Sequence, residues 1–244
     1  MDVFADLAAE QDRLEQLLAG LSETEWATDS AAPGWTVADV VLHLAQTEEA
    51  VVASAGGSDL HALGEATPGA NLDERMDSLV RAERTDPAVI FERWRTARRA
   101  ALNTLQDADP QQLMPWAENG LKPRTLATTR LAEHWAHGLD ITAPLGIPFP
   151  DTDRLRHIAW LGHATLPFAF ALAGQPAQVV RCELVGPDGT VWTFGPDDAE
   201  SAITGAAGAF CRVGARRMAP ADSGLSMSGP HGAAALSVLR NYAA

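Results

Sequence analysis

The stretch PGWTVADVVLHLAQTEEAVV, residues 33–52, decides the fold that the sequence predicts. Near its start, Thr36 and Asp39 have the T-x-x-D spacing of a capping box, which satisfies the free amides of a first helical turn. Apolar residues then recur at helical spacing, which predicts a helix over 37–54. His43 lies in the second turn of this helix among valines and leucines. We therefore expect its side chain to point into or along the core of a helical bundle.

Three further segments show helical periodicity: residues 3–21, 73–105 and 125–139. The second is expected to break or kink near Asp86-Pro87, because proline removes a helix hydrogen bond. The third is expected to end near Gly138 and Pro144. Four long helices joined by loops predict a four-helix bundle, whose core is a usual place for a metal site built from facing side chains.

The character of the chain changes near Gly174. A further helix is expected before it, over 152–173. After it, two alternating segments flank the turn sequence Gly186-Pro187-Asp188-Gly189, which predicts a β-hairpin over 179–194. The remaining expected elements are a helix over 198–217, a strand over 224–228 and a helix over 230–241. The sequence therefore predicts a mainly α protein, with a helical bundle over 1–174 and a small α+β domain over 175–244.

A second informative stretch is RLAEHWAHGLDITAPLG, residues 130–146. Glu133 and His137 are four residues apart, so on a helix they are offset by only about 40° and leave the same face. With His43 they could supply three ligands to one divalent metal and leave a position open, as in catalytic zinc sites. The alternative is a core histidine together with an ordinary i,i+4 contact. The apolar neighbours favour the metal, since a buried carboxylate is costly unless it is paired or bound.

Residues beside these three candidates have expected roles as well. His134 is rotated by about 100° from Glu133, so it is not expected to bind the same metal. Asp140 follows His137 by three residues and Gln46 follows His43 by three, so each could orient an imidazole through a hydrogen bond. The other histidines are expected to be structural: His157, His163 and His231.

Charge and composition exclude several classes of function. Acidic residues outnumber basic ones by 32 to 18, and the net charge of −14 argues against nucleic-acid binding, which needs clustered cations. No apolar stretch approaches the ~20 residues of a membrane span, and the N-terminal segment lacks the features of a secretory signal. Cys182 and Cys211 are expected to be buried small hydrophobes in a reducing cytoplasm.

The stretches 33–52 and 130–146 together resemble the DinB-like metalloprotein superfamily. They are most similar to its branch of mycothiol-dependent maleylpyruvate isomerases and related thiol-dependent transferases. The tail over 178–240, which includes ITGAAGAFCRVGARR at 203–217, is similar to the C-terminal domain of that branch. The resemblance covers nearly the whole chain, and it implies a DinB-like four-helix bundle with a small C-terminal α+β domain.

The resemblance implies that His43, Glu133 and His137 bind a divalent metal, zinc by preference, with water as the fourth ligand. Members of this branch use the open position to activate a low-molecular-weight thiol, because a metal-bound thiol loses its proton and becomes a ready nucleophile. It thus implies mycothiol as a cosubstrate. The function expected on this ground is a thiol-dependent isomerase or S-transferase that acts on a small molecule.

The resemblance also implies an arginine from the C-terminal domain near the metal. The candidates are Arg217 and Arg212 for a catalytic role and Arg216 for cofactor binding. A guanidinium there could hold a carboxylate of thiol or substrate through two hydrogen bonds. The alternative is a solvated helix end, where a cation is favoured by the helix dipole.

Two other functions remain open from the residues. A metal without a thiol could drive hydrolysis, dehydration or cyclisation of a small metabolite. A metal-stabilised binding protein is the non-catalytic alternative, and a fourth protein ligand would support it, since structural sites are closed. The loops 55–72 and 106–124 are expected to determine the substrate. Exposed bundle faces would allow a homodimer.

Overall fold

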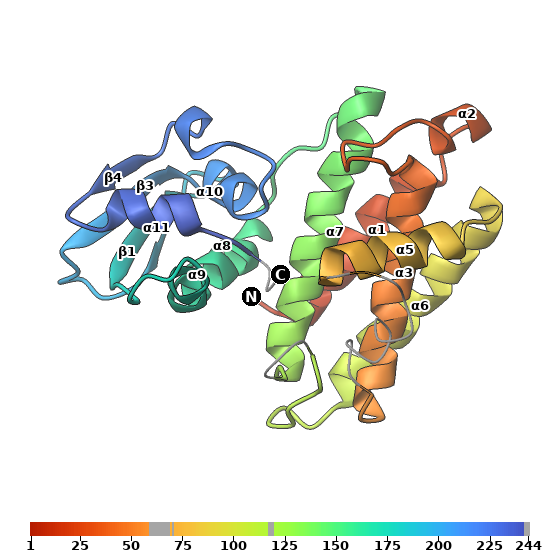
Figure 1. Cartoon of the computed structure of the whole chain (residues 1–244), viewed down its shortest axis with the longest axis horizontal. Coiled ribbons are helices and arrows are strands. Elements are labelled where there is room, and N and C mark those ends of the chain that lie inside the picture. The colour runs from red at the N-terminus through yellow and green to blue at the C-terminus, as the bar shows by residue number, and fades with distance from the viewer. Residues whose placement is uncertain (59–68, 70, 117–119, 242–244) are drawn as a thin grey trace. The chain divides into compact units, whose positions relative to one another are not determined.

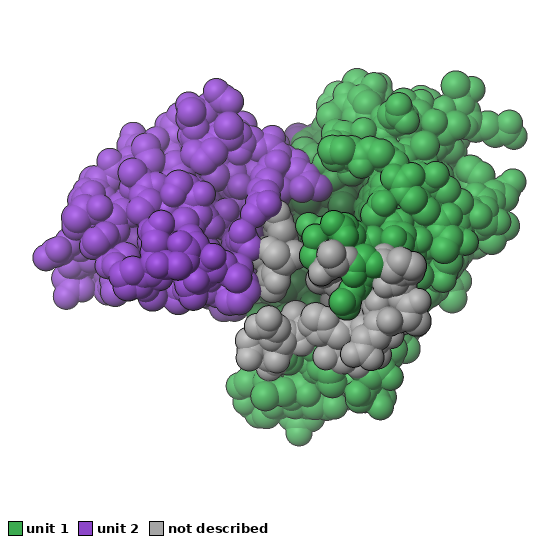
Figure 2. All heavy atoms as spheres, viewed as in Figure 1, with its two compact units in different colours: residues 1–149, 244 green, residues 150–243 purple. Residues whose placement is uncertain are grey.

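The computed structural model describes residues 1–58, 69, 71–116 and 120–241. The chain divides into two compact units, residues 1–149 and 150–243, here called unit 1 and unit 2 and coloured separately in Figure 2. Parts of the two predicted loops, residues 59–68, 70 and 117–119, lie outside the described residues. No helix in the described part of the chain is long and apolar enough to cross a membrane.

Unit 1 is helical, with elements α1 (Val3–Leu18), α2 (Glu23–Trp26), α3 (Val37–Ala55), α5 (Leu72–Ala82), α6 (Pro87–Asp107) and α7 (Pro123–Leu145). The predicted four-helix bundle is confirmed: α3 packs on α6, α1 packs on α7, and α1 with α6 and α3 with α7 complete the bundle (Figure 1). Its core holds fully buried side chains from several of these helices, including Leu14, Val41, Leu44, Ile90 and Trp94.

The start of α3 is fixed by the predicted capping box. The Thr36 hydroxyl accepts from the Asp39 amide at 3.2 Å, and the Asp39 carboxylate accepts from the Thr36 amide at 2.8 Å. The cap therefore sets where α3 begins. His43 lies on the face of α3 that is directed at α7, where it contacts Glu133.

The break predicted near Asp86-Pro87 is confirmed: the segment expected over 73–105 is two helices, because Asp86 caps a new helix whose first residue is Pro87. The helix expected over 125–139, with its end near Gly138 and Pro144, extends to Leu145 and is followed by Gly146, which has a positive φ of 65°. Gly138 is interior to α7, where the ring of Phe149 packs so closely that a Cβ would lie 2.5 Å from it.

Unit 2 combines helices with a four-stranded sheet. Its helices are α8 (Leu155–Ala164), α9 (Leu166–Leu172), α10 (Ala207–Gly214), the 3-10 turn η1 (Pro220–Asp222) and α11 (Gly232–Val238). Its strands are β1 (Val180–Val185), β2 (Val191–Phe194), β3 (Ser201–Ala206) and β4 (Ser226–Ser228), in the order β2-β1-β3-β4. The predicted hairpin is β1 and β2, which pair antiparallel.

The helix predicted over 198–217 is wrong in its first half. Residues 201–206 form β3, which pairs in parallel with β1 so that Ile203 lies opposite Cys182. Ser201 and Ile203 are fully buried in this interior strand, and the helix α10 starts only at Ala207. Cys182 and Cys211 are both buried and unpaired with each other, as expected. Burial raises the pKa of the Cys182 thiol to about 12, so it is not a reactive thiolate.

The compact units meet at 149/150, whereas the sequence pattern placed the domain boundary at 174/175. The reason for the difference is α8, which packs on α10 within unit 2. Gly162 of α8 lies against Phe210, and the Cys211 thiol donates to the Leu155 carbonyl at 3.7 Å. The helix predicted over 152–173 is in fact α8 and α9, with Pro167 in the first turn of α9.

Candidate metal centre

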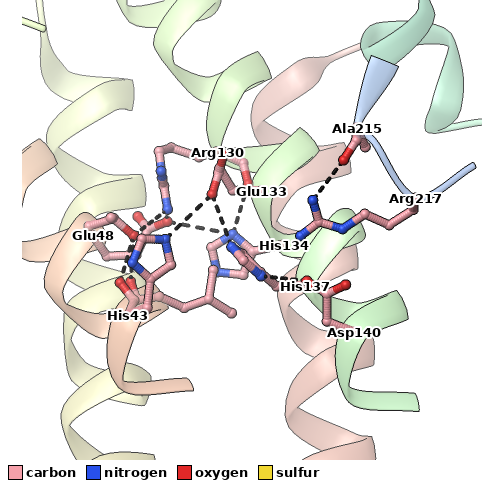
Figure 3. A network of polar contacts seen from close by, with 11 residues as sticks. His43, Glu48, Arg130, Glu133, His134, His137, Asp140, Ala215 and Arg217 are labelled. Atoms are coloured by element: carbon pink, nitrogen blue, oxygen red, sulfur yellow. Dashed lines mark hydrogen bonds and ion pairs between the residues drawn. The ribbon is translucent and has the colours of Figure 1, made fainter. Parts of the chain in front are cut away.

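Three side chains converge between α3 and α7, as Figure 3 shows. His43 comes from α3, and Glu133 and His137 come from successive turns of α7. The Glu133 carboxylate oxygen Oε2 lies 3.3 Å from His137 Nε2 and 3.7 Å from His43 Nε2. One possible ligand atom from each of the three residues lies within 4.8 Å of the other two. The structure thus brings together the three residues predicted as ligands.

These separations match the needs of a small metal ion. Two donor atoms that are each ~2.1 Å from a tetrahedral ion are about 3.4 Å apart. The two distances to Glu133 Oε2 bracket that value. The imidazole rings of His43 and His137 are 5.0 Å apart between centroids and inclined at 72°, so they do not stack against each other. The contacts of Glu133 with both imidazoles thus have the spacing of donor atoms around one ion.

The charges in the cluster suit a cation. Burial lowers the pKa of His43, which favours the neutral imidazole that a metal requires. Burial acts to raise the pKa of Glu133, but its contacts with His137 and His43 outweigh this and hold the pKa well below its usual range. Burial acts to lower the pKa of His137, and hydrogen bonds to Asp140 and Glu133 outweigh it, so this pKa is raised.

Asp140 has the predicted orienting contact. Its Oδ2 lies 3.0 Å from His137 Nδ1, the ring nitrogen turned away from Glu133. With the Nδ1 proton donated to Asp140, the lone pair of His137 is on Nε2. The corresponding expectation for Gln46 is wrong, because its amide nitrogen donates to Glu83 at 3.0 Å instead. His43 Nδ1 has no hydrogen-bond partner among the described residues.

His134 is fully buried, and it lies outside the ligand trio. Its Nε2 lies 3.2 Å from the indole nitrogen of Trp94, and its Nδ1 lies 2.8 Å from the Arg130 carbonyl. The indole N–H can only donate, so Nε2 accepts and Nδ1 carries the proton. Burial lowers the pKa of His134 to about 3. This histidine is therefore a neutral structural residue that links α6 to α7.

Sequence reasoning missed a buried ion pair beside the trio. Arg130 Nε donates to Glu48 Oε1 at 2.9 Å, and Arg130 Nη2 donates to the Thr47 hydroxyl at 2.6 Å. Both charged side chains, drawn in Figure 3, come from facing helices, and each is at most 2% exposed. The sequence offered only one sign of this pair, its nearness to the trio along the chain. Glu48 is five residues after His43, and Arg130 is three residues before Glu133. The pattern QTEEAVV gave no reason to bury Glu48 rather than Glu49.

Trp35 covers one side of the two imidazoles. Its ring centroid lies 5.0 Å from that of His43 and 6.5 Å from that of His137. The indole nitrogen donates to Asp77 of α5 at 2.8 Å, which fixes the ring in place. Arg84, in the loop after α5, also contacts the start of α3: its guanidinium donates two 2.8 Å hydrogen bonds to Asp39.

The three candidate arginines all belong to unit 2. Arg212 of α10 makes two 2.8 Å hydrogen bonds to the carboxylate of Asp151. Arg217 donates to the Ala215 carbonyl at 2.7 Å, and Arg216 has a positive φ of 57°. Arg216 and Arg217 also line a cavity of about 640 Å³ in unit 2. Their roles toward the metal ligands of unit 1 stay a prediction.

Comparisons with known proteins agree with this architecture. Residues 7–142 match the family model described as the mycothiol maleylpyruvate isomerase N-terminal domain. Two uncharacterised proteins of Mycobacterium tuberculosis, from strains CDC 1551 and H37Rv, are each 37% identical over 221 residues, which is 88% of this chain and 85% of the relative.

Two solved structures share the fold. The crystal structure of the mycothiol-dependent maleylpyruvate isomerase superposes with a TM-score of 0.62 at 14% identity, covering 93% of this chain and 95% of that one. A mutant of the same enzyme gives a TM-score of 0.61 with the same identity and coverage. At 14% identity this likeness shows the fold, and the chemistry has to be argued from the residues of the site.

Proposed function

The chain belongs to the mycothiol maleylpyruvate isomerase N-terminal domain family, and on this premise we propose that it is a metal-dependent, thiol-dependent enzyme. The reaction proposed is the isomerisation of a cis double bond, or S-transfer to an electrophilic carbon, in a small molecule. Zinc is the proposed metal and mycothiol the proposed thiol. His43, Glu133 and His137 are the proposed metal ligands.

The observation that carries the proposal is that three possible ligands converge at one point, rather than four. Among the residues that the structure describes, the group that could hold an ion comprises two imidazoles and one carboxylate. Three protein ligands are typical of a catalytic zinc, whereas a structural zinc has four. Two nitrogens and one oxygen also suit zinc and other divalent transition metals better than calcium or magnesium.

A divalent ion in this position would lower the pKa of a thiol that took the open coordination position, so that its sulfur would be a thiolate at neutral pH. Two side chains beside the ligands would support this chemistry. Asp140 holds His137 in the tautomer with its lone pair on Nε2. Trp35 shields the imidazoles on one side and limits the access of water there.

The proposed isomerisation balances without any further reactant. The thiolate sulfur forms a bond to one carbon of a cis double bond, and the π electrons move onto the conjugated carbonyl oxygen. Rotation about the resulting single bond follows. The electron pair then returns to re-form the double bond in the trans geometry, and the carbon–sulfur bond breaks to release the thiolate. S-transfer would stop after the addition, with a proton taken up at carbon.

An anionic substrate group needs a cation, and Arg217, Arg212 or Arg216 is proposed to supply it. A guanidinium pairs with a carboxylate through two parallel hydrogen bonds. Arg212 already binds Asp151 in this way, so its release would cost that ion pair. Arg217 is therefore the preferred candidate for the catalytic role.

The test measures isomerisation of maleylpyruvate by zinc-loaded protein, with and without mycothiol. The proposal expects turnover that requires mycothiol and that is lost in His43→Ala. A matched control is His163→Gln, since His163 lies in unit 2 and contacts the Val180 carbonyl instead of the trio. Turnover of an electrophile that is equally fast without any thiol would overturn the thiol-dependent proposal in favour of thiol-independent metal chemistry.

A further inference from the structure

The pair Glu48 and Arg130 is the most deeply buried ion pair in the described part of the chain, with side chains 0% and 2% exposed. It connects the same two helices that carry the candidate metal ligands. Glu48 and Thr47 belong to α3, and Arg130 belongs to α7. The two hydrogen bonds from Arg130, at 2.9 and 2.6 Å, bind both residues of α3 at once.

This pair lies close to the trio along both helices. Thr47, whose hydroxyl accepts from Arg130, donates to the backbone carbonyl of His43 at 3.0 Å. Arg130 precedes Glu133 by three residues, so the two side chains are neighbours on α7. The close-up in Figure 3 shows Glu48, Arg130, His43 and Glu133 in one continuous polar cluster between the helices.

Stability alone does not account for burying these charges. A buried ion pair contributes net stability only if its geometry is excellent and its remaining polar atoms are satisfied, and an apolar pair of similar volume is often as stable. Glu48 Oε2 has no hydrogen-bond partner among the described residues. Packing and stability alone therefore do not explain why these charges are buried between α3 and α7.

We propose that the Glu48–Arg130 pair is a positioning element for the metal centre. It holds α3 and α7 in the register at which His43 meets Glu133 and His137 before any metal binds. This inference rests on the proposed function for the identity of the three ligands.

The test replaces the pair by apolar residues in the full-length chain, as Glu48→Leu with Arg130→Met. The matched control is Glu49→Leu with Arg93→Met. That pair also starts on α3, makes two 2.7 Å hydrogen bonds and joins α3 to α6, away from the ligand-bearing α7. Three quantities are measured: the thermal unfolding midpoint, the Zn²⁺ affinity by competition with a chromophoric chelator, and the imidazole NMR signals of His43 and His137 in metal-free protein.

The proposal expects the Glu48/Arg130 variant to unfold near the wild-type temperature but to bind Zn²⁺ about 10–100-fold more weakly, the usual loss when an outer partner of a metal ligand is removed. The imidazole signals of His43 and His137 should shift or broaden in this variant. In the control variant, the affinity and both signals should stay at the wild-type values. Wild-type affinity together with unchanged imidazole signals in the Glu48/Arg130 variant would overturn the proposal.

Should the double variant fail to fold, Arg130→Lys provides the same comparison. Lysine keeps the positive charge but has a single nitrogen, so it cannot reproduce the simultaneous hydrogen bonds from Nε to Glu48 and from Nη2 to Thr47. Displaced imidazole signals in metal-free Arg130→Lys protein support the proposal, and unchanged ones contradict it. Because this readout needs no metal, it is independent of the proposed function. Absence of Zn²⁺ binding by the wild type would overturn the proposed function, whereas the imidazole signals test the positioning by Glu48 and Arg130.

Discussion

His137 is the residue on which the proposed chemistry depends most, because each of its ring nitrogens faces a carboxylate. Asp140 Oδ2 lies 3.0 Å from Nδ1, and Glu133 Oε2 lies 3.3 Å from Nε2. The first contact fixes the tautomer, and the second marks the place that a metal would take. A carboxylate behind a ligating histidine increases its basicity and orients its ring.

Asp140→Ala should therefore weaken zinc binding about 10–100-fold without abolishing it. The three ligands remain, but the His137 imidazole loses the partner that holds its Nε2 lone pair toward the site. Chelator competition at constant pH measures the change. Asp197→Ala, at an exposed acid that pairs with Arg181 in unit 2, is the control and should leave the affinity unaltered.

Zinc affinity should fall as the pH is lowered, because protons compete with the metal for the imidazoles. The raised pKa of His137 means that this residue holds its proton to a higher pH than an ordinary histidine. The affinity should thus decrease as pH falls through that raised pKa, and be fully present above it. Asp140→Asn removes one cause of the raised pKa, so the midpoint of the profile should move to lower pH. A midpoint that does not move would contradict the assigned role of Asp140.

Among single residues, the sequence alone was enough to predict those candidates whose spacing along a helix is regular. His43, Glu133, His137 and Asp140 were found because helical spacing relates the last three and apolar neighbours surround the first. Glu48 and Arg130 were missed because an acid in QTEEAVV and an arginine at a helix position resemble ordinary solvated charges. Their burial depends on how α3 faces α7, which is a tertiary fact that spacing along one helix does not contain.

Among the elements, α3 and α7 are the pair that builds the site, and their ends were predicted with different success. The capping box predicted the start of α3, since both of its hydrogen bonds form within four residues. The strand β3 was predicted as helix because it runs directly into the following helix α10, with no loop between Ala206 and Ala207. Its pairing with β1 is a long-range contact, and local pattern cannot reveal it.

Thr36→Ala should lower the free energy of unfolding by about 1 kcal/mol, the typical loss for an N-cap hydroxyl. The Thr36 side chain accepts from the Asp39 amide, and alanine leaves that donor without its cap. Urea titration followed by circular dichroism measures the difference. Thr24→Ala, at an exposed threonine in α2, is the control and should cost distinctly less. Equal values for the two variants would contradict the capping role.

Trp35 is held beside His43 by its hydrogen bond to Asp77 of α5, so its fluorescence is expected to report metal binding. Co²⁺ bound by the trio should quench Trp35 fluorescence, because the indole is 5.0 Å from the His43 ring. Trp35→Phe should remove most of the quenching that wild-type protein shows on Co²⁺ addition. Trp160→Phe, at an exposed tryptophan of unit 2, should retain it. Full quenching in Trp35→Phe would place the bound metal elsewhere.

At the scale of the whole molecule, the chain separates the candidate ligands from the candidate arginines. The ligands belong to unit 1, and Arg212, Arg216 and Arg217 belong to unit 2. The fold class of both parts could be predicted from the sequence, because helical periodicity and a hairpin pattern are local. The assignment of α8 to unit 2 could not, because the contact between α8 and α10 joins segments that are about fifty residues apart.

Arg217→Ala should reduce kcat/KM by about 10–100-fold, the loss expected for a hydrogen-bonded charge pair worth about 1.5–3 kcal/mol. Zinc content should stay at the wild-type value, since Arg217 is not a ligand. Steady-state kinetics with mycothiol and elemental analysis of the same sample measure both quantities. Arg181→Ala, at the Glu183 ion pair on β1, is the control. Unchanged kinetics in Arg217→Ala would remove that arginine from the proposed site.

The central claim is that one metal ion is held by His43, Glu133 and His137. Its most direct test is the zinc content of purified protein by elemental analysis, for wild type beside His43→Ala, His137→Ala and His163→Gln. About one equivalent of zinc is expected in wild type and in His163→Gln, and loss of zinc in the other two variants. Full zinc content in His43→Ala, or none in wild type after reconstitution, would contradict it.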